Sequence, residues 1–319
     1  MPSWGHILNE VNQSLQKGDR NAFDTVRRKY ISELQKKTGR NLIVYASKWT
    51  AGDAAPHLIS INDEDVHAFM EAVHGLKGDD LDLVLHTGGG SAEATDAIVS
   101  YLRQKFKSIR VIIPQAAMSA GTMLACAADQ IIMGKHSSIG PIDPQFILNT
   151  QTGLQAVPAH AIIEQFEKAQ KEISENPKLL SSWMPMLGQY GPALIIRCKN
   201  QIQFAKQTVE NWLKSYMLKG QDALAEKIAE HLSNHDNFKT HGKHINIIEA
   251  KKLGFNILDL EADQDLQDKV LSAFHATMIT MNTSAVKIIC NHNGNAYVKQ
   301  HQMIQAPIQV KPGQQHIQL

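Results

Sequence analysis

Residues 109–121 read Ile-Arg-Val-Ile-Ile-Pro-Gln-Ala-Ala-Met-Ser-Ala-Gly and decide the fold of this chain. The largely apolar run at 109–113 predicts a buried strand, and it gives way after Pro114 to a series of small residues. A helical stretch follows at once and extends to Ala128. Ser119 therefore lies at a strand-to-helix elbow, beside free backbone N–H groups that favour negative charge. This position suits a nucleophile and half of an oxyanion hole.

The same alternation of strand and helix extends to both sides of the elbow. Further strands are predicted at 41–46, 81–86 and 130–133, and helical stretches separate them. The run at 81–86 is mostly apolar, as expected for a strand that is covered on both faces. Strands joined in this way indicate an α/β fold with a parallel sheet and βαβ crossovers.

The pattern along the chain predicts four regions. They are an N-terminal helical segment, the sheet with its helices, a C-terminal helix with a hairpin, and a Gln- and Pro-rich disordered tail, at residues 1–40, 41–262, 263–303 and 304–319.

Composition and charge give no reason to expect a nucleic acid or a membrane as partner. The 319 residues carry a formal net charge of +1, which gives no reason to expect nucleic acid as a partner. The three scattered cysteines, Cys126, Cys198 and Cys290, indicate reduced thiols and a cytoplasmic location. No basic N-terminal region precedes an apolar stretch, and no long apolar run exists. Neither a signal peptide nor a membrane partner is therefore expected.

A second motif follows the strand at 81–86. In Thr87-Gly-Gly-Gly90 the glycines allow the backbone to adopt positive φ and to approach a ligand closely. We assign the amide of Gly89 and the amide of Ala120 to a two-donor oxyanion hole, in which each donor is worth about 3 kcal/mol. The glycine run could also be only a tight turn, and Ser119 could also be a helix cap.

A serine nucleophile needs a proton acceptor. His160, His241 and His244 are the candidates, because they lie on expected loops or at the ends of elements. Asp143, in Gly140-Pro-Ile-Asp-Pro144, lies on a turn that proline makes rigid. Its carboxylate could orient a histidine and stabilise the charged imidazole.

Other ionisable residues fit a catalytic role less well. Lys168 and Lys171 could serve as a lysine base, but they fall on the polar face of an expected helix. His231 and His235 lie four residues apart, which is acceptable metal-ligand spacing, but no His-Glu-x-x-His motif or cysteine pair accompanies them. We therefore expect no metal and no cofactor.

Three segments together resemble one protein family. They are Leu85-His-Thr-Gly-Gly-Gly90, Ala117-Met-Ser-Ala-Gly-Thr-Met123 and Gly140-Pro-Ile-Asp-Pro-Gln145. The chain is similar over nearly its whole length, to about Gln300, to the serine dehydrogenase proteinase family. That family is related to the proteolytic subunit of Clp protease and to signal peptide peptidase A, so the resemblance implies a Clp/crotonase-like catalytic domain at 41–262.

The resemblance also implies a Ser, Asp, His triad in that chain order. It places the nucleophile on Ser119 and the aspartate on Asp143, and it favours His241 over His160 as the histidine. The family usually has Pro-Gly-Gly after the threonine, whereas here Gly88 replaces the proline. This departure brings the efficiency of the oxyanion loop into question.

The expected function is that of an ATP-independent, cytoplasmic serine endopeptidase. Its partners would be a peptide or unfolded protein substrate and, by resemblance, further copies of the same chain. Two alternatives remain open at this point. A crotonase-type acyl-CoA enzyme would share the two-amide oxyanion hole, and a catalytically inactive scaffold would keep the fold without the reaction.

Overall fold

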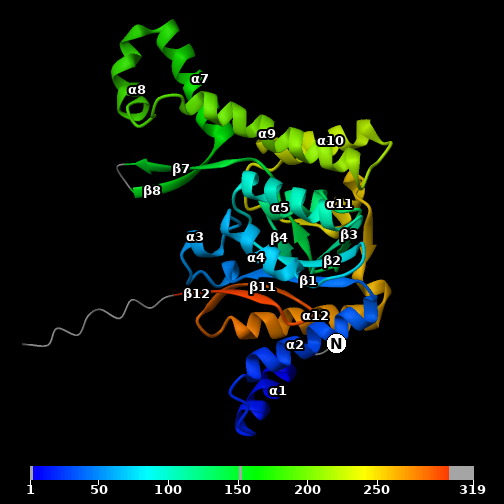
Figure 1. Ribbon diagram of the computed structural model, residues 1–319. Helices are drawn as coiled ribbons and strands as arrows, with labels where there is room; N and C mark the ends of the chain where they lie inside the picture. The colour runs from blue at the N-terminus through cyan, green and yellow to red at the C-terminus, as the bar shows by residue number, and fades with distance from the viewer. Residues whose placement is uncertain (1–2, 151–152, 302–319) are drawn as a thin grey trace, which may run out of the picture.

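A seven-stranded, mostly parallel sheet forms the centre of the computed structural model, which describes residues 3–150 and 153–301 (Figure 1). The five strands from β10 to β1 run parallel to one another, β11 is antiparallel to β1, and β12 is antiparallel to β11. In spatial order they are β10 (Ile257–Asp259), β5 (Gln130–Met133), β3 (Ser108–Ile113), β2 (Asp80–His86), β1 (Asn41–Ser47), β11 (Ala285–Asn291) and β12 (Ala296–Gln300). The predicted α/β fold is confirmed.

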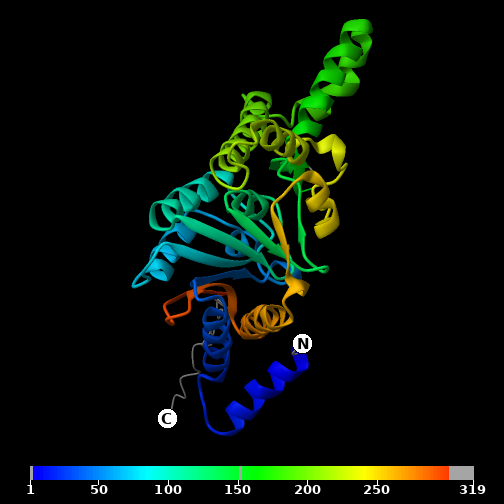
Figure 2. The same ribbon diagram turned by 90° about the vertical axis from the view of Figure 1, so that its right-hand side faces the viewer.

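Helices cover both faces of this sheet, which is why its central strands are apolar on both sides. In β1, Ile43 and Tyr45 pack into one core, while Leu42 and Val44 pack into the other. On the first face lie α4 (Glu64–Val73), α5 (Ala92–Lys105), α6 (Ala120–Cys126), α9 (Leu194–Ser215), α10 (Asp222–Ser233) and α11 (Ile247–Leu253). On the second lie α1 (Trp4–Gln16), α2 (Ala22–Thr38) and α12 (Gln264–Thr280) (Figures 1 and 2).

The remaining elements lie around this core. Two helices and a hairpin project from the α9 side of the molecule (Figure 1). They are α7 (Ala159–Glu175), α8 (Leu180–Leu187), β7 (Gln145–Thr150) and β8 (Gly153–Pro158). The short elements are α3 (Pro56–Ile59), β4 (Ala116–Ala117), β6 (Ser138–Ile139), β9 (Ile245–Asn246) and the 3-10 turns η1 (Trp49–Ala51), η2 (Pro177–Leu179), η3 (His235–Asn237) and η4 (Leu260–Ala262).

The hairpin β7–β8 is an element that the sequence did not predict. Phe146, Leu148 and Val157 pack against a small core around Ala159 and Cys198, so the hairpin is held by α7 and α9 and not by the main sheet. The predicted C-terminal hairpin joins the sheet beside β1. The tail expected at 304–319 lies outside the described residues, and the proposed region boundaries stay a prediction.

A buried ion pair connects the C-terminal hairpin to the centre of the fold. Lys287 Nζ lies 2.8 and 2.9 Å from the two carboxylate oxygens of Asp65, and both side chains are almost completely buried. The same ammonium donates to the carbonyl of Ser60 at 2.7 Å, and Tyr45 Oη donates to Asp65 Oδ2 at 2.8 Å. Burial lowers the pKa of Lys287. This network fixes the segment around Ser60, next to the glycine loop.

Removing the ammonium should destabilise the fold strongly. In Lys287→Met the Asp65 carboxylate stays buried without its cation, so we expect the free energy of unfolding to fall by about 3–5 kcal/mol in urea titrations. The control is Lys299→Met, which removes an ion pair with the half-exposed Glu64 and should change that free energy by less than about 1 kcal/mol. Equal effects of the two substitutions would contradict this account of the buried pair.

Candidate active site

Ser119 occupies a strained elbow between β4 and α6. Its backbone has φ 52° and ψ −117°, a region that residues with a side chain rarely adopt. Its hydroxyl makes no capping hydrogen bond to α6 and has no hydrogen-bond partner among the described residues, although the residue lines a cavity. The side chain is therefore held at the start of a helix without serving as its cap.

The glycine loop is fastened to this elbow through the backbone. Thr87 N donates to the carbonyl of Ala116 at 3.1 Å, and Met118 N donates to the carbonyl of Thr87 at 3.0 Å. A Cβ atom at Gly89, where φ is +101°, would lie 2.7 Å from the Cβ of Ser119 and 3.0 Å from the amide nitrogen of Ala120. Only glycine permits this approach, so the loop and the elbow form one unit.

The loop amide that is left without an acceptor is not the one that the sequence analysis assigned to the oxyanion hole. Gly89 N donates to Thr87 Oγ1 at 3.1 Å, so this amide already has an acceptor. Ile61 bonds to both sides of Gly90, because Ile61 N donates to the Gly89 carbonyl at 2.8 Å and Ser91 N donates to the Ile61 carbonyl at 2.9 Å. In such a parallel bridge the N–H of the middle residue points the other way. In the described part of the chain, the amides of Gly90 and Ala120 have no acceptor.

Asp143 and His241 come together as the sequence suggested. His241 Nδ1 lies 2.7 Å from Asp143 Oδ1, and Asp143 is only 1% exposed. An ionised carboxylate can only accept, so the imidazole donates through Nδ1 and keeps Nε2 as a proton acceptor. This is the tautomer that a general base requires.

Ser119 and His241 line the same cavity of about 520 Å³. The glycine loop, part of β7 and part of α9 complete its wall, through Gly88–Gly90, Gln145–Ile147, Arg197 and Gln201 among others. No hydrogen bond joins the serine hydroxyl to His241 within residues 3–150 and 153–301. Catalytic hydrogen bonds are often long before substrate binds, so two residues on one cavity can still act together in the reaction.

The other candidate bases lie elsewhere. His160 Nε2 lies 3.2 Å from the carbonyl of Ser233, and His160 does not line the cavity. His244 Nδ1 bonds to Ser138 Oγ at 2.6 Å. Lys168 and Lys171 are exposed on α7, as expected from the polar face of that helix.

His235 is the residue that the sequence reasoning missed. Its spacing from His231 fits two metal ligands on one helix, but α10 ends at Ser233 and His235 begins the turn η3. Its Nδ1 lies 3.0 Å from Asp143 Oδ2. No local pattern could have shown this contact, because 92 residues separate the two side chains.

The space beside Gly88 has a definite occupant. A Cβ atom there would lie 3.2 Å from Cδ2 of the Trp49 indole. The indole also contacts His86, with ring centroids 5.7 Å apart. The glycine that stands here in place of proline therefore lies against the Trp49 indole.

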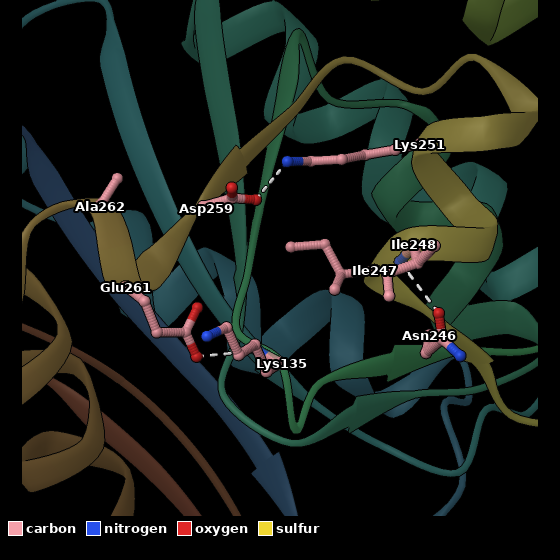
Figure 3. Close-up of a pocket in the computed structure, with 8 residues that line it drawn as sticks. All are labelled: Lys135, Asn246, Ile247, Ile248, Lys251, Asp259, Glu261 and Ala262. Atoms are coloured by element: carbon pink, nitrogen blue, oxygen red, sulfur yellow. Dashed lines mark hydrogen bonds and ion pairs between the residues drawn. The ribbon is translucent and has the colours of Figure 1, made fainter.

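A separate pocket of about 610 Å³ lies between the end of β10 and α11 (Figure 3). Lys251 pairs with Asp259 across it, and Lys135 N donates to Glu261 Oε1 at 2.8 Å. None of the predicted site residues lines this pocket. It lacks a nucleophile beside a base, so the chemistry points to the Ser119 cavity instead.

The family comparison agrees with this geometry. The model of the ClpP-like SDH-type serine proteinase family matches residues 18–289, which is most of the chain. The chain belongs to this family. Serine peptidase activity is thus the activity of its family. The resemblance inferred from the three motifs is confirmed.

Two relatives of this family member come from Methanocaldococcus jannaschii. The uncharacterized protein MJ0137 is 30% identical over 62% of this chain and 60% of its own length. The uncharacterized protein MJ1495 is 28% identical over 71% of this chain and 70% of its own length. The match thus leaves 40% of the first relative and 30% of the second uncovered.

Solved structures with similarity to this proteinase family member include two proteases. A variant of the 1510-N membrane-bound stomatin-specific protease in complex with a substrate peptide is 18% identical, over 76% of this chain and 83% of that chain, with a TM-score of 0.38. ClpP1 from Listeria monocytogenes is 16% identical, over 68% and 91%, with a TM-score of 0.35. In this chain, no helix of the described residues is both long and apolar enough to cross a membrane.

The elbow strain predicts a stability difference between two variants of Ser119. Ser119→Gly relieves the positive φ, whereas Ser119→Ala keeps it, so the glycine variant should have a free energy of unfolding about 1 kcal/mol higher. Chemical denaturation of both proteins measures this difference. Ser100→Gly, at an exposed position inside α5, is the control and should be about 1 kcal/mol less stable than Ser100→Ala, because the helical backbone there gains nothing from glycine. An alanine variant as stable as the glycine variant would contradict the strain.

Proposed function

We propose that this protein hydrolyses peptide bonds with Ser119 as nucleophile. His241 takes the hydroxyl proton through Nε2 and returns it to the leaving amine, while Asp143 stabilises the imidazolium that forms between these steps. The observation that carries the proposal is the 2.7 Å contact between Asp143 and His241, with His241 and the strained Ser119 on one cavity.

The oxyanion donors of this proposal are the amides of Gly90 and Ala120. Both lack an acceptor among the described residues and both residues line the cavity, whereas the Gly89 amide donates to Thr87. Gly89 contributes by letting the loop approach the elbow. Each preorganised donor would stabilise the tetrahedral oxyanion by about 3 kcal/mol.

An extended peptide is the substrate that suits the cavity wall. Residues 145–147 of β7 line the cavity, and β7 pairs only with β8 among the described strands. A substrate backbone could therefore bond to the unpaired edge of β7, as in other complexes formed by strand addition. We propose internal bonds of unfolded protein as the targets, cleaved without ATP.

Two further expectations belong to this proposal. Cys126, Cys198 and Cys290 are buried free thiols, which suits a reducing compartment such as the cytoplasm. Self-association would use α8 and the start of α9, because Leu180 and Met184 on the first helix and Ile196 on the second expose apolar side chains.

Removing the nucleophile tests the reaction directly. Ser119→Ala should lower the turnover of fluorescent casein by at least about 1,000-fold, because no covalent acyl-enzyme can form. A fluorophosphonate probe should label the wild-type protein and fail to label the variant.

Ser60→Ala is the matched control for this test. Ser60 also lines the cavity, but its hydroxyl donates to the carbonyl of Pro56 at 2.7 Å, so turnover and labelling should persist. Unchanged casein turnover in Ser119→Ala would end the proposal. Protection from thermal unfolding by an acyl-CoA, without labelling, would favour a crotonase-type enzyme instead.

A pair of histidine variants tests the base. His241→Asn should lower kcat by roughly 100- to 10,000-fold, because the general base is lost while the fold is kept. His160→Gln should leave kcat within about threefold, since His160 lies outside the cavity. Steady-state kinetics on a peptide substrate decides between them. The reverse result would make His160 the base.

A further inference from the structure

The Asp143 carboxylate accepts hydrogen bonds from two imidazoles at once. His241 Nδ1 lies 2.7 Å from Oδ1, and His235 Nδ1 lies 3.0 Å from Oδ2. Gln145 Nε2 donates to the same Oδ2 at 3.0 Å. Both oxygens are therefore engaged, and the carboxylate has little freedom to rotate.

His235 cannot itself act on the substrate. It does not line the cavity that holds Ser119 and His241. Its ring stacks on His160 instead, with centroids 6.5 Å apart and planes inclined by 18°. A role for His235 in the reaction must therefore pass through Asp143.

We propose that His235 is a positioning residue for His241, and that its own protonation competes for the Asp143 charge. This inference rests on the proposed function. With His235 neutral, its Nδ1–H fixes Oδ2, so Oδ1 faces His241 and the full negative charge stabilises the His241 imidazolium. With His235 protonated, one buried carboxylate faces two cations, and formation of the second imidazolium becomes unfavourable.

Few other charges face His235. His160 stacks on its ring, and Asp143 accepts its Nδ1–H. On its own turn, Asp236 pairs with Lys239 at 2.7 Å, and both of these side chains are exposed. The buried carboxylate is thus the main partner of His235, which makes coupling between the two imidazoles through Asp143 the dominant effect.

The coupling is tested first without any catalysis. In Ser119→Ala protein labelled with ¹⁵N on histidine, the NMR titration of His241 should be broader than a one-proton curve, with a Hill coefficient below one. Adding His235→Asn, which keeps an N–H donor but carries no titrating charge, should restore a one-proton curve. Adding His160→Gln instead should leave the broad curve, because His160 does not touch Asp143.

Activity supplies the second readout. For wild type, log kcat/KM should fall toward acid pH with a slope approaching two, and for His235→Asn with a slope of one, while kcat at pH 8 stays within threefold. His235→Ala, which also loses the donor, should lower kcat about tenfold with KM unchanged, because Asp143 is then less well aligned.

The two proposals fail separately. A wild-type protein without hydrolysis would count against the peptidase, while the titration would still decide the role of His235. A one-proton titration of His241 in the Ser119→Ala protein, or a coupled titration that survives His235→Asn, would overturn the inference. Equal acid slopes for wild type and His235→Asn would also overturn it.

Discussion

The candidate site depends on the hydrogen bonds that the Asp143 carboxylate accepts. This carboxylate joins two parts of the chain that are distant in sequence. It accepts from Gln145, two residues away at the start of β7, and from His235 and His241, which follow α10 and are 92 and 98 residues away. It is almost completely buried, so each donor that is lost would leave this charge less well compensated. The position of the cavity wall and the position of the base are therefore fixed by one side chain.

The sequence predicted those parts of the fold that local patterns determine. The strands at 81–86 and 130–133 and the elbow at Ser119 follow from runs of apolar residues and from small residues between elements. The β7–β8 hairpin did not, because its apolar side chains, such as Phe146 and Val157, face a small separate core and give only a weak alternation. Burial against α7 and α9 decides that element, and burial is not visible in sequence.

In the candidate site, too, the sequence predicted only what local motifs determine. Motif resemblance placed Ser119, Asp143 and His241, and the structure brings the last two into contact and the first onto the same cavity. The resemblance could not show which glycine amide lacks an acceptor in the described part of the chain. Gly89 N donates to Thr87 Oγ1, while Ile61 bonds to the residues on either side of Gly90 and leaves the Gly90 amide without a partner there. Side-chain direction and long-range pairing carry this information, and neither has a local signature.

Support for the glycine loop comes from the far end of the chain. Ile61 forms two backbone bonds around Gly90, and the preceding carbonyl of Ser60 accepts from Lys287 on β11. The ammonium of Lys287 is buried and would be unfavourable there without Asp65. An apolar residue in its place could fill the volume but could not hold a carbonyl. The buried charge thus supplies a fixed donor to the backbone that precedes Ile61, and through Ile61 it supports the loop at Gly90.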